Sequence, residues 1–296
     1  MSEPMQQVIQ DLTRVSTGEA PAGTKCSLTR IRRGGTPLLW EETISIELGG
    51  KAHYSSLRSF VDAAGWPIGI WETPANEQTV RALARTLLEV KFWDIPIPPV
   101  APGGEENRWE CSVGNGVISL SADDGPGILM KMAKVDLLFR RIANDLIASR
   151  SGAALNCKLH ISHRGTTAEV EVALVNEGNM DFQIQNPLKS PDVRNNFLRV
   201  EIGAVPAEVP GVTGSEIAYK PLDFPDTGKP SALWDQDCII LKAGQEVIWP
   251  FKLPIDLSAR RGQFVRAIYS HYGTTRTHAG LPLVRGRVLS SETQLK

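Results

Sequence analysis

The spacing of apolar residues changes once along this chain, near residue 150, and that change constrains the fold more than any other feature. Before it, two segments carry apolar residues at helical spacing. The first begins after Asn76, a residue type that favours the N-cap position, and repeats at i, i+3, i+4, i+7 and i+8 through Val80, Leu83, Ala84, Leu87 and Leu88. The second spans residues 128–149. Beyond it, only short alternating segments separated by Gly, Pro and Asn remain, which indicates strands.

The first half predicts an antiparallel sheet with helices on one face. A short amphipathic helix at residues 4–15 and a turn-rich linker form a leading segment, residues 1–23. Alternation then predicts three strands before the first long helix and two strands after it. The last two are joined through Gly114-Asn115-Gly116, and Asn-Gly is a strong hairpin signal. Because hairpins join neighbouring strands, we expect an α+β domain over residues 24–150.

The second half predicts an immunoglobulin-like β-sandwich over residues 155–290. Its segments alternate in hydrophobicity, and clear turns interrupt them at 176–179 and 242–245. Residues 204–236 are rich in Pro and Gly and have a weak pattern, so they are interpreted as a long excursion from the sandwich.

Composition excludes several classes of protein. The 296 residues are 42% hydrophobic and 22% charged, with a formal net charge of −1, so no global attraction to nucleic acid or to an anionic membrane is expected. No run of about 18 apolar residues predicts a membrane span. The N-terminal residues lack the pattern of a secretory signal, which predicts a cytoplasmic protein. Its four cysteines, Cys26, Cys111, Cys157 and Cys238, are then expected to be free thiols.

The sequence contains few residues in patterns typical of catalytic or metal-binding sites. Cys157, His160 and His163 lie close together, but in a strand His160 faces away from the other two, so no metal site is predicted and no cofactor is expected. No GxSxG nucleophile motif is present. If the protein is instead a hydrolase with a site between its domains, His160, His163 or His271 is the expected general base.

Tryptophans followed by acids are the most unusual feature that remains. Aromatic residues on loops, surrounded by polar ones, are typical anchors of protein interfaces, and carboxylates would engage basic groups of a target. The sequence therefore predicts a set of partner-binding residues: Trp40, Glu41, Glu42, Trp66, Trp71, Glu72, Trp234 and Asp235.

Both halves resemble bacterial inhibitor modules. A strand before Gly34-Gly35, a hairpin, a helix of pattern ValxxLAxxLL, a second hairpin and a closing helix make residues 24–148 similar to inhibitor domains of the emfourin kind. The second half has Val-Asn-Glu-Gly at 175–178 and Leu-Lys-Ala-Gly-Gln-Glu-Val at 241–247, and is similar to immunoglobulin-like inhibitor and accessory modules. The resemblance implies a non-catalytic protein that neutralises a bacterial toxin or enzyme by occlusion, as immunity proteins do.

Two other classes of function stay open at this point. One is the hydrolase with an inter-domain site described above. The other is a structural or assembly module that uses free sandwich edges for strand addition. The oligomeric state and the identity of the partner are left open as well.

Overall fold

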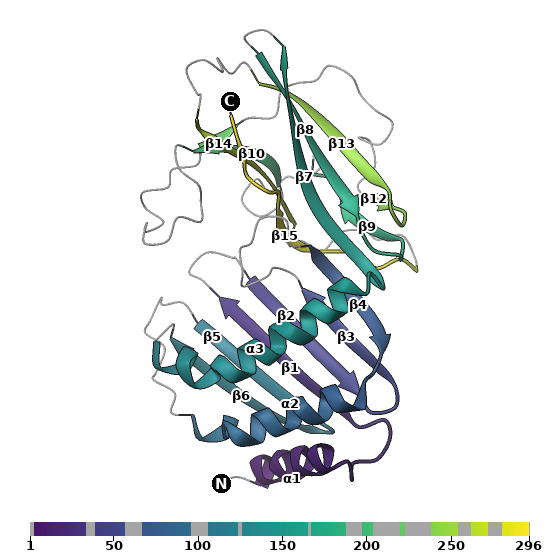
Figure 1. Cartoon of the computed structure of the whole chain (residues 1–296), viewed down its shortest axis with the longest axis vertical. Coiled ribbons are helices and arrows are strands. Elements are labelled where there is room, and N and C mark those ends of the chain that lie inside the picture. Colours follow the sequence, from purple (N-terminus) through teal and green to yellow (C-terminus); the bar gives the residue numbers. More distant parts are fainter. Residues whose placement is uncertain are drawn as a thin grey trace. The chain divides into compact units, whose positions relative to one another are not determined.

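The computed structural model describes residues 3–33, 39–56, 67–95, 106–123, 126–164, 167–187, 197–203, 220–222, 238–253, 262–271 and 280–295. The chain forms two compact units (Figure 1). Unit 1 comprises residues 1–58 and 70–152, and unit 2 comprises residues 59–69 and 153–296. Unit 1 thus includes the leading segment 1–23 as well as the predicted domain, and residues 59–69 join the second unit although they lie within the first half of the sequence.

Unit 1 is an antiparallel sheet with helices. In chain order its elements are α1 (Glu3–Thr17), β1 (Lys25–Arg33), β2 (Leu39–Glu47), β3 (Lys51–Ser56), β4 (Ile68–Pro74, of which residues 70–74 belong to this unit), α2 (Glu77–Glu89), the 3₁₀ turn η1 (Phe92–Asp94), β5 (Glu106–Val113), β6 (Gly116–Asp123) and α3 (Pro126–Ala148). Its strands are ordered β4-β3-β2-β1-β5-β6. Helices α2 and α3 lie over the same face of this sheet (Figure 1), and α1 packs against α2, β5 and β6. This confirms the predicted mixed α+β architecture of antiparallel sheet and helices.

The N-cap residue and the apolar stripe that the sequence predicts for the first long helix are both present in α2. The side chain of Asn76 accepts a hydrogen bond from the backbone N–H of Gln78 at 2.9 Å, so it caps α2 as predicted. The apolar stripe of this helix is buried through Val80, Leu83, Ala84 and Leu87. On β1 and β2, every second residue is buried under the helices, because successive strand side chains point to opposite faces.

The β5–β6 hairpin forms with a turn one residue earlier than the Asn-Gly signal indicates. Val113 pairs with Gly116, so the two turn residues are Gly114 and Asn115. Gly114 has a φ of +56°, whereas Asn115 is outside the left-handed region. A two-residue turn with glycine in its first position and positive φ only there has the II′ geometry that suits a hairpin. The hairpin prediction is therefore right, and the turn depends on the first glycine.

The described part of unit 2 contains strands and the turns between them, and no helix. The strands are β7 (Gly152–Arg164), β8 (Thr167–Asn176), β9 (Phe182–Gln185), β10 (Phe197–Gly203), β11 (Lys220–Leu222), β12 (Cys238–Leu241), β13 (Glu246–Leu253), β14 (Phe264–His271), β15 (Gly286–Leu289) and β16 (Thr293–Gln294). Antiparallel pairing joins β13-β8-β7, β11-β10-β14-β15 and β12-β9, and β16 pairs with β14. The predicted excursion, residues 204–236, lies outside the described residues except for β11.

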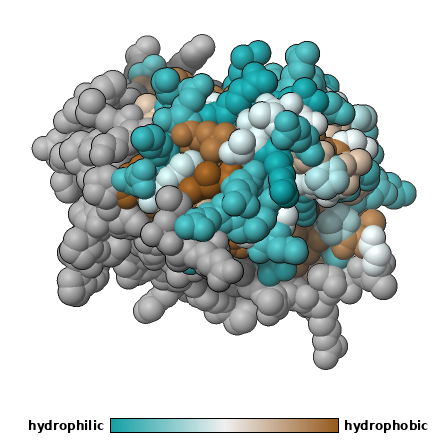
Figure 2. All heavy atoms as spheres, turned by 90° about the horizontal axis from the view of Figure 1, so that it is seen from below, coloured by the Kyte–Doolittle hydropathy of each residue, from teal (hydrophilic) through white to brown (hydrophobic). Residues whose placement is uncertain are grey.

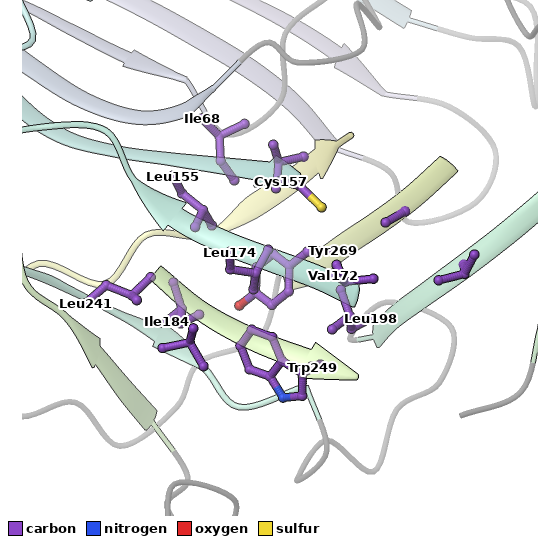
Figure 3. Close-up of a cluster of buried hydrophobic side chains, with 14 of the residues drawn as sticks. Ile68, Leu155, Cys157, Val172, Leu174, Ile184, Leu198, Leu241, Trp249 and Tyr269 are labelled. Atoms are coloured by element: carbon purple, nitrogen blue, oxygen red, sulfur yellow. The ribbon is translucent and has the colours of Figure 1, made fainter. Parts of the chain in front are cut away.

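The core of unit 2 draws side chains from all of these strand groups. Trp249 from β13 and Tyr269 from β14 are its largest members and are fully buried. Around them pack Leu174 from β8, Ile184 from β9 and Leu198 from β10 (Figure 3). Burial of large apolar side chains removes area from water at roughly 25 cal/mol per Å², which is the main stabilising contribution to such a core.

Candidate binding face

The face of the unit 1 sheet opposite α2 and α3 carries polar side chains on neighbouring strands. We call it the open face. On β2 it carries Glu41, Thr43, Ser45 and Glu47, which alternate with the buried Glu42, Ile44 and Ile46. Cross-strand pairing places further side chains beside them: Lys25, Ser27, Thr29 and Ile31 on β1, Lys51, His53 and Ser55 on β3, Arg108, Glu110 and Ser112 on β5, and Val117 and Ser119 on β6.

The exposed apolar side chains of the described residues do not form a second candidate binding surface. The large exposed hydrophobic side chains of the described residues lie on separate elements or loops: Val117, Leu137, Met180, Ile240 and Ile248. Seen from below, the described surface is mainly hydrophilic, with small hydrophobic areas between polar side chains (Figure 2). Singly scattered apolar residues are normal on a protein surface, so they carry no argument for a site.

Hydrogen bonds between strands hold the side chains of the open face. The hydroxyl of Ser27 donates to that of Ser45 at 2.8 Å, and the hydroxyls of Thr29 and Thr43 lie 3.1 Å apart in the next row. Arg108 donates to Glu110 of its own strand, β5, at 2.7 Å, and to Ser119 of β6 at 3.2 Å. Side chains fixed in this way lose less conformational entropy when a partner covers them, so the face is preorganised for recognition.

Three charged or titratable groups meet at the β3–β4 edge of the open face. Lys51 Nζ lies 2.9 Å from Glu72 Oε2, and His53 Nδ1 lies 3.6 Å from Glu72 Oε1. The hydrogen bond from Lys51 lowers the pKa of Glu72 and raises that of Lys51. Burial lowers the pKa of His53 below its ordinary value of 6.5, against the opposing attraction of Glu72. Near neutral pH the cluster therefore holds a carboxylate, an ammonium and a neutral imidazole.

Ser45, His53 and Glu72 follow one another across β2, β3 and β4, as a serine, a base and an orienting acid do in a catalytic triad. Nδ1 of His53 is the nitrogen nearest Glu72, which assigns its proton to Nδ1 and leaves Nε2 as an acceptor. Ser45, however, is only 6% exposed, and its oxygen accepts the bond from Ser27. The Ser45 hydroxyl is therefore poorly accessible to a substrate in this structure.

The sequence-predicted acids separate between the two faces of the sheet. Glu41 and Glu72 both lie on the open face, although they come from β2 and β4. Glu42 lies on the helix-covered face, where it is buried and accepts a hydrogen bond from Tyr54 Oη at 2.9 Å. Glu42 is 5% exposed and therefore not accessible on the surface, which corrects the expectation of a surface role. The reason is strand alternation, which sends neighbouring acids to opposite sides.

The predicted loop tryptophans need a similar correction. Trp71 lies in β4 and is 0% exposed; its ring stacks on Tyr54 with centroids 5.2 Å apart. It is a core residue and not an exposed anchor. Trp40 lies in β2, opposite Arg32 in register, and not in a loop. Trp66, Trp234 and Asp235 lie outside the described residues.

The other candidate groups do not form a reactive centre among the described residues. Cys157 is buried while His160, three residues along β7, is exposed, and within the described ranges no three His, Cys, Asp or Glu side chains gather as metal ligands. His271 is buried in β14, and the side chain of His163 lies outside the described part. All four cysteines are free and buried, and burial raises the pKa of Cys26 to about 12. No described helix is long and apolar enough to cross a membrane.

Sequence reasoning did not single out His53, Lys51 or the paired hydroxyls. Each lies in an alternating strand segment, TKCSLTRIR, ETISIEL or KAHYSSL, which carries no catalytic motif. The hairpin register alone, Ser45 opposite His53, was the signal that places these groups side by side. Comparison of the chain with protein-family models and with curated proteins gave no match.

Proposed function

We propose that this chain is a non-catalytic binding protein that neutralises a partner protein by occlusion, and that the open face of unit 1 is its contact surface. The observation that carries the proposal is the convergence of Glu41 and Glu72 on one preorganised face. A polar face of fixed side chains recognises its partner through hydrogen bonds and charge complementarity, which give specificity and fast association.

The charges of the open face favour a basic partner. Its side chains of described burial include Lys25, Lys51 and Arg108 against Glu41, Glu47, Glu72 and Glu110, which leaves one more acid than base. Lys51 and Arg108 are already paired with Glu72 and Glu110. Glu41 and Glu47 are therefore the acids through which cationic groups of a partner would bind.

The class of partner follows from the resemblance of both halves to bacterial inhibitor modules. An immunity protein for a secreted toxin, or an inhibitor of an enzyme with a basic cleft, fits a chain whose described residues form a polar face and no cluster of metal ligands. An immunoglobulin-like arrangement of the unit 2 strands and a cytoplasmic location belong to the same proposal.

Affinity capture from the native host, with the full chain as bait, tests the proposal. We expect a protein that binds at low salt, dissociates as salt rises, and is lost when the bait carries both Glu41→Lys and Glu47→Lys. Glu77→Lys combined with Glu89→Lys is the control matched in charge, because both are exposed acids on α2, away from the open face. Equal capture by wild type, the double variant and the control would reject the open face as the contact surface.

A further inference from the structure

His53 is the one histidine on the described open face, and charged groups from three strands surround it. Glu72 of β4 approaches its Nδ1 to 3.6 Å. Lys51, two residues earlier on β3, is bound to the same carboxylate, and Lys25 of β1 acts on the imidazole electrostatically. Ser45 of β2, directly opposite, adds no charge. The imidazole is 34% exposed, so it is within reach of a partner that covers the face.

Protonation of His53 changes the charge of the face. With a neutral imidazole the described charges are three positive (Lys25, Lys51, Arg108) and four negative (Glu41, Glu47, Glu72, Glu110), which sum to −1. A protonated imidazole brings the sum to zero. A basic partner is then attracted less strongly, because the new positive charge lies next to the carboxylate of Glu72.

Burial of the open face by a partner also weakens binding when His53 is protonated. A bound partner removes the remaining water from the imidazole, and loss of water disfavours the charged form of histidine. Charge repulsion and desolvation both oppose binding to the protonated face, so the sign of the effect does not depend on which one is larger.

We propose that His53 makes binding by the open face proton-dependent, so that a basic partner is held while the imidazole is neutral and is released as acid protonates it. This inference rests on the proposed function of the open face. The lowered pKa of His53 places the release at mildly acidic pH, below 6.5. Thermodynamic linkage requires the converse as well: partner binding lowers the pKa of His53 further.

A lysine decapeptide at low ionic strength serves as the basic probe, and its binding to the full chain is measured by titration calorimetry at pH 7.5 and pH 5.5. Wild type should lose about twofold to fivefold in affinity at the lower pH, which is what up to one pKa unit of coupling gives at pH 5.5 when the pKa of the free imidazole is below 6.5. His53→Gln should remove most of this loss. His160→Gln, which changes an exposed histidine of unit 2, should retain it.

The possible results distinguish the proposed role of His53 from the proposed binding function of the open face. An equal loss of affinity in wild type and His53→Gln would overturn the role of His53 while leaving the open face as the binding surface. Peptide binding that Glu41→Lys and Glu47→Lys do not weaken would place the site elsewhere and overturn the proposed function and the proton dependence together. NMR titration of the imidazole provides an independent readout: the amide signals of Ser45 and Glu72 should move with the same midpoint as His53. If the amide signals of Ser45 and Glu72 do not share the midpoint of His53, protonation of the imidazole does not affect the open face, and the proposed role of His53 is overturned.

Discussion

Arg30 donates a hydrogen bond to Asp136 at 2.6 Å, and this contact joins the central strand β1 to helix α3 across 106 residues of sequence. The guanidinium also lies 5.2 Å from the centre of the Trp109 ring, and Asp136 accepts a second contact from Arg140 at 2.8 Å. Arg30 pairs with Glu42 on one side and with Trp109 on the other in the strand register. A charged row therefore occupies one end of an otherwise apolar core.

Asp136→Asn should destabilise unit 1, because it removes the negative charge that faces the largely buried guanidinium of Arg30. Arg30 is 11% exposed and Asp136 is 23% exposed, so the pair is only partly screened by water. We expect a loss of about 2–3 kcal/mol in the free energy of unfolding, measured by urea denaturation.

Arg140→Ala is the matched control for this contact. Arg140 binds the same carboxylate but is 46% exposed, so its removal should cost less than about 1 kcal/mol. Similar losses of unfolding free energy in the two variants would show that the Arg30–Asp136 contact stabilises unit 1 no more than the Arg140–Asp136 contact does.

The sequence predicted the helices and strands that form this core, but it did not predict the contact between the polar side chains Arg30 and Asp136. Helical spacing and Asn76 located α2, and alternation located β1 and β2, because both signals depend on neighbouring residues. The sequence pattern of β1 indicates a strand but not the partner of Arg30. That partner, Asp136, lies on a helix far along the chain, and only the packed structure brings the two together.

The residues of the open face were predicted in part for the same reason. Glu41 and Glu72 were chosen for their place beside tryptophans, and their side chains are accessible on the open face because strand alternation turns Trp71 and Glu42 inward. His53 and Lys51 needed the pairing of β3 with its neighbours. Register is a property of two strands, and a single strand does not reveal it.

Gly152→Ala should be among the most damaging substitutions in the chain. A Cβ at this position would overlap the backbone carbonyl oxygen of Ile70, and the φ of +150° is one that L residues rarely adopt. Because the obstacle is backbone and not a flexible side chain, we expect a loss above about 3 kcal/mol or a failure to accumulate folded protein. Circular dichroism and urea denaturation measure it.

Gly244→Ala distinguishes backbone strain from overlap. Gly244 also has a positive φ, +72°, but no atom lies within 4 Å of its added Cβ. It should cost only about 1 kcal/mol. If both variants lose the same stability, the close approach at Gly152 is not the cause.

Ser56→Ala should leave unit 1 as stable as wild type or more stable by up to about 1 kcal/mol. The Ser56 hydroxyl is buried and has no hydrogen-bond partner among the described residues, so its removal relieves a desolvation cost without breaking a bond. Tyr54→Phe on the same strand is the contrasting change. It removes the bond to the buried Glu42 carboxylate and should cost about 1.5–3 kcal/mol in the same denaturation experiment. A clear loss of stability in Ser56→Ala would mean that this hydroxyl has a partner in solution.

The free energy of unfolding should depend on pH in part through the titration of His53. Its pKa is lowered in the folded chain, chiefly by burial, so the unfolded chain binds more protons as the pH falls below 6.5. The contribution of this group is therefore fully present above pH 6.5 and is lost as the pH falls through the lower folded-state pKa. His53→Gln should flatten this part of the profile of unfolding free energy against pH. Glu72→Gln should steepen it, because the Glu72 carboxylate raises the pKa of His53 and its removal lets burial lower that pKa further. Profiles that run parallel in wild type and His53→Gln would show that the imidazole has its ordinary pKa in the folded chain.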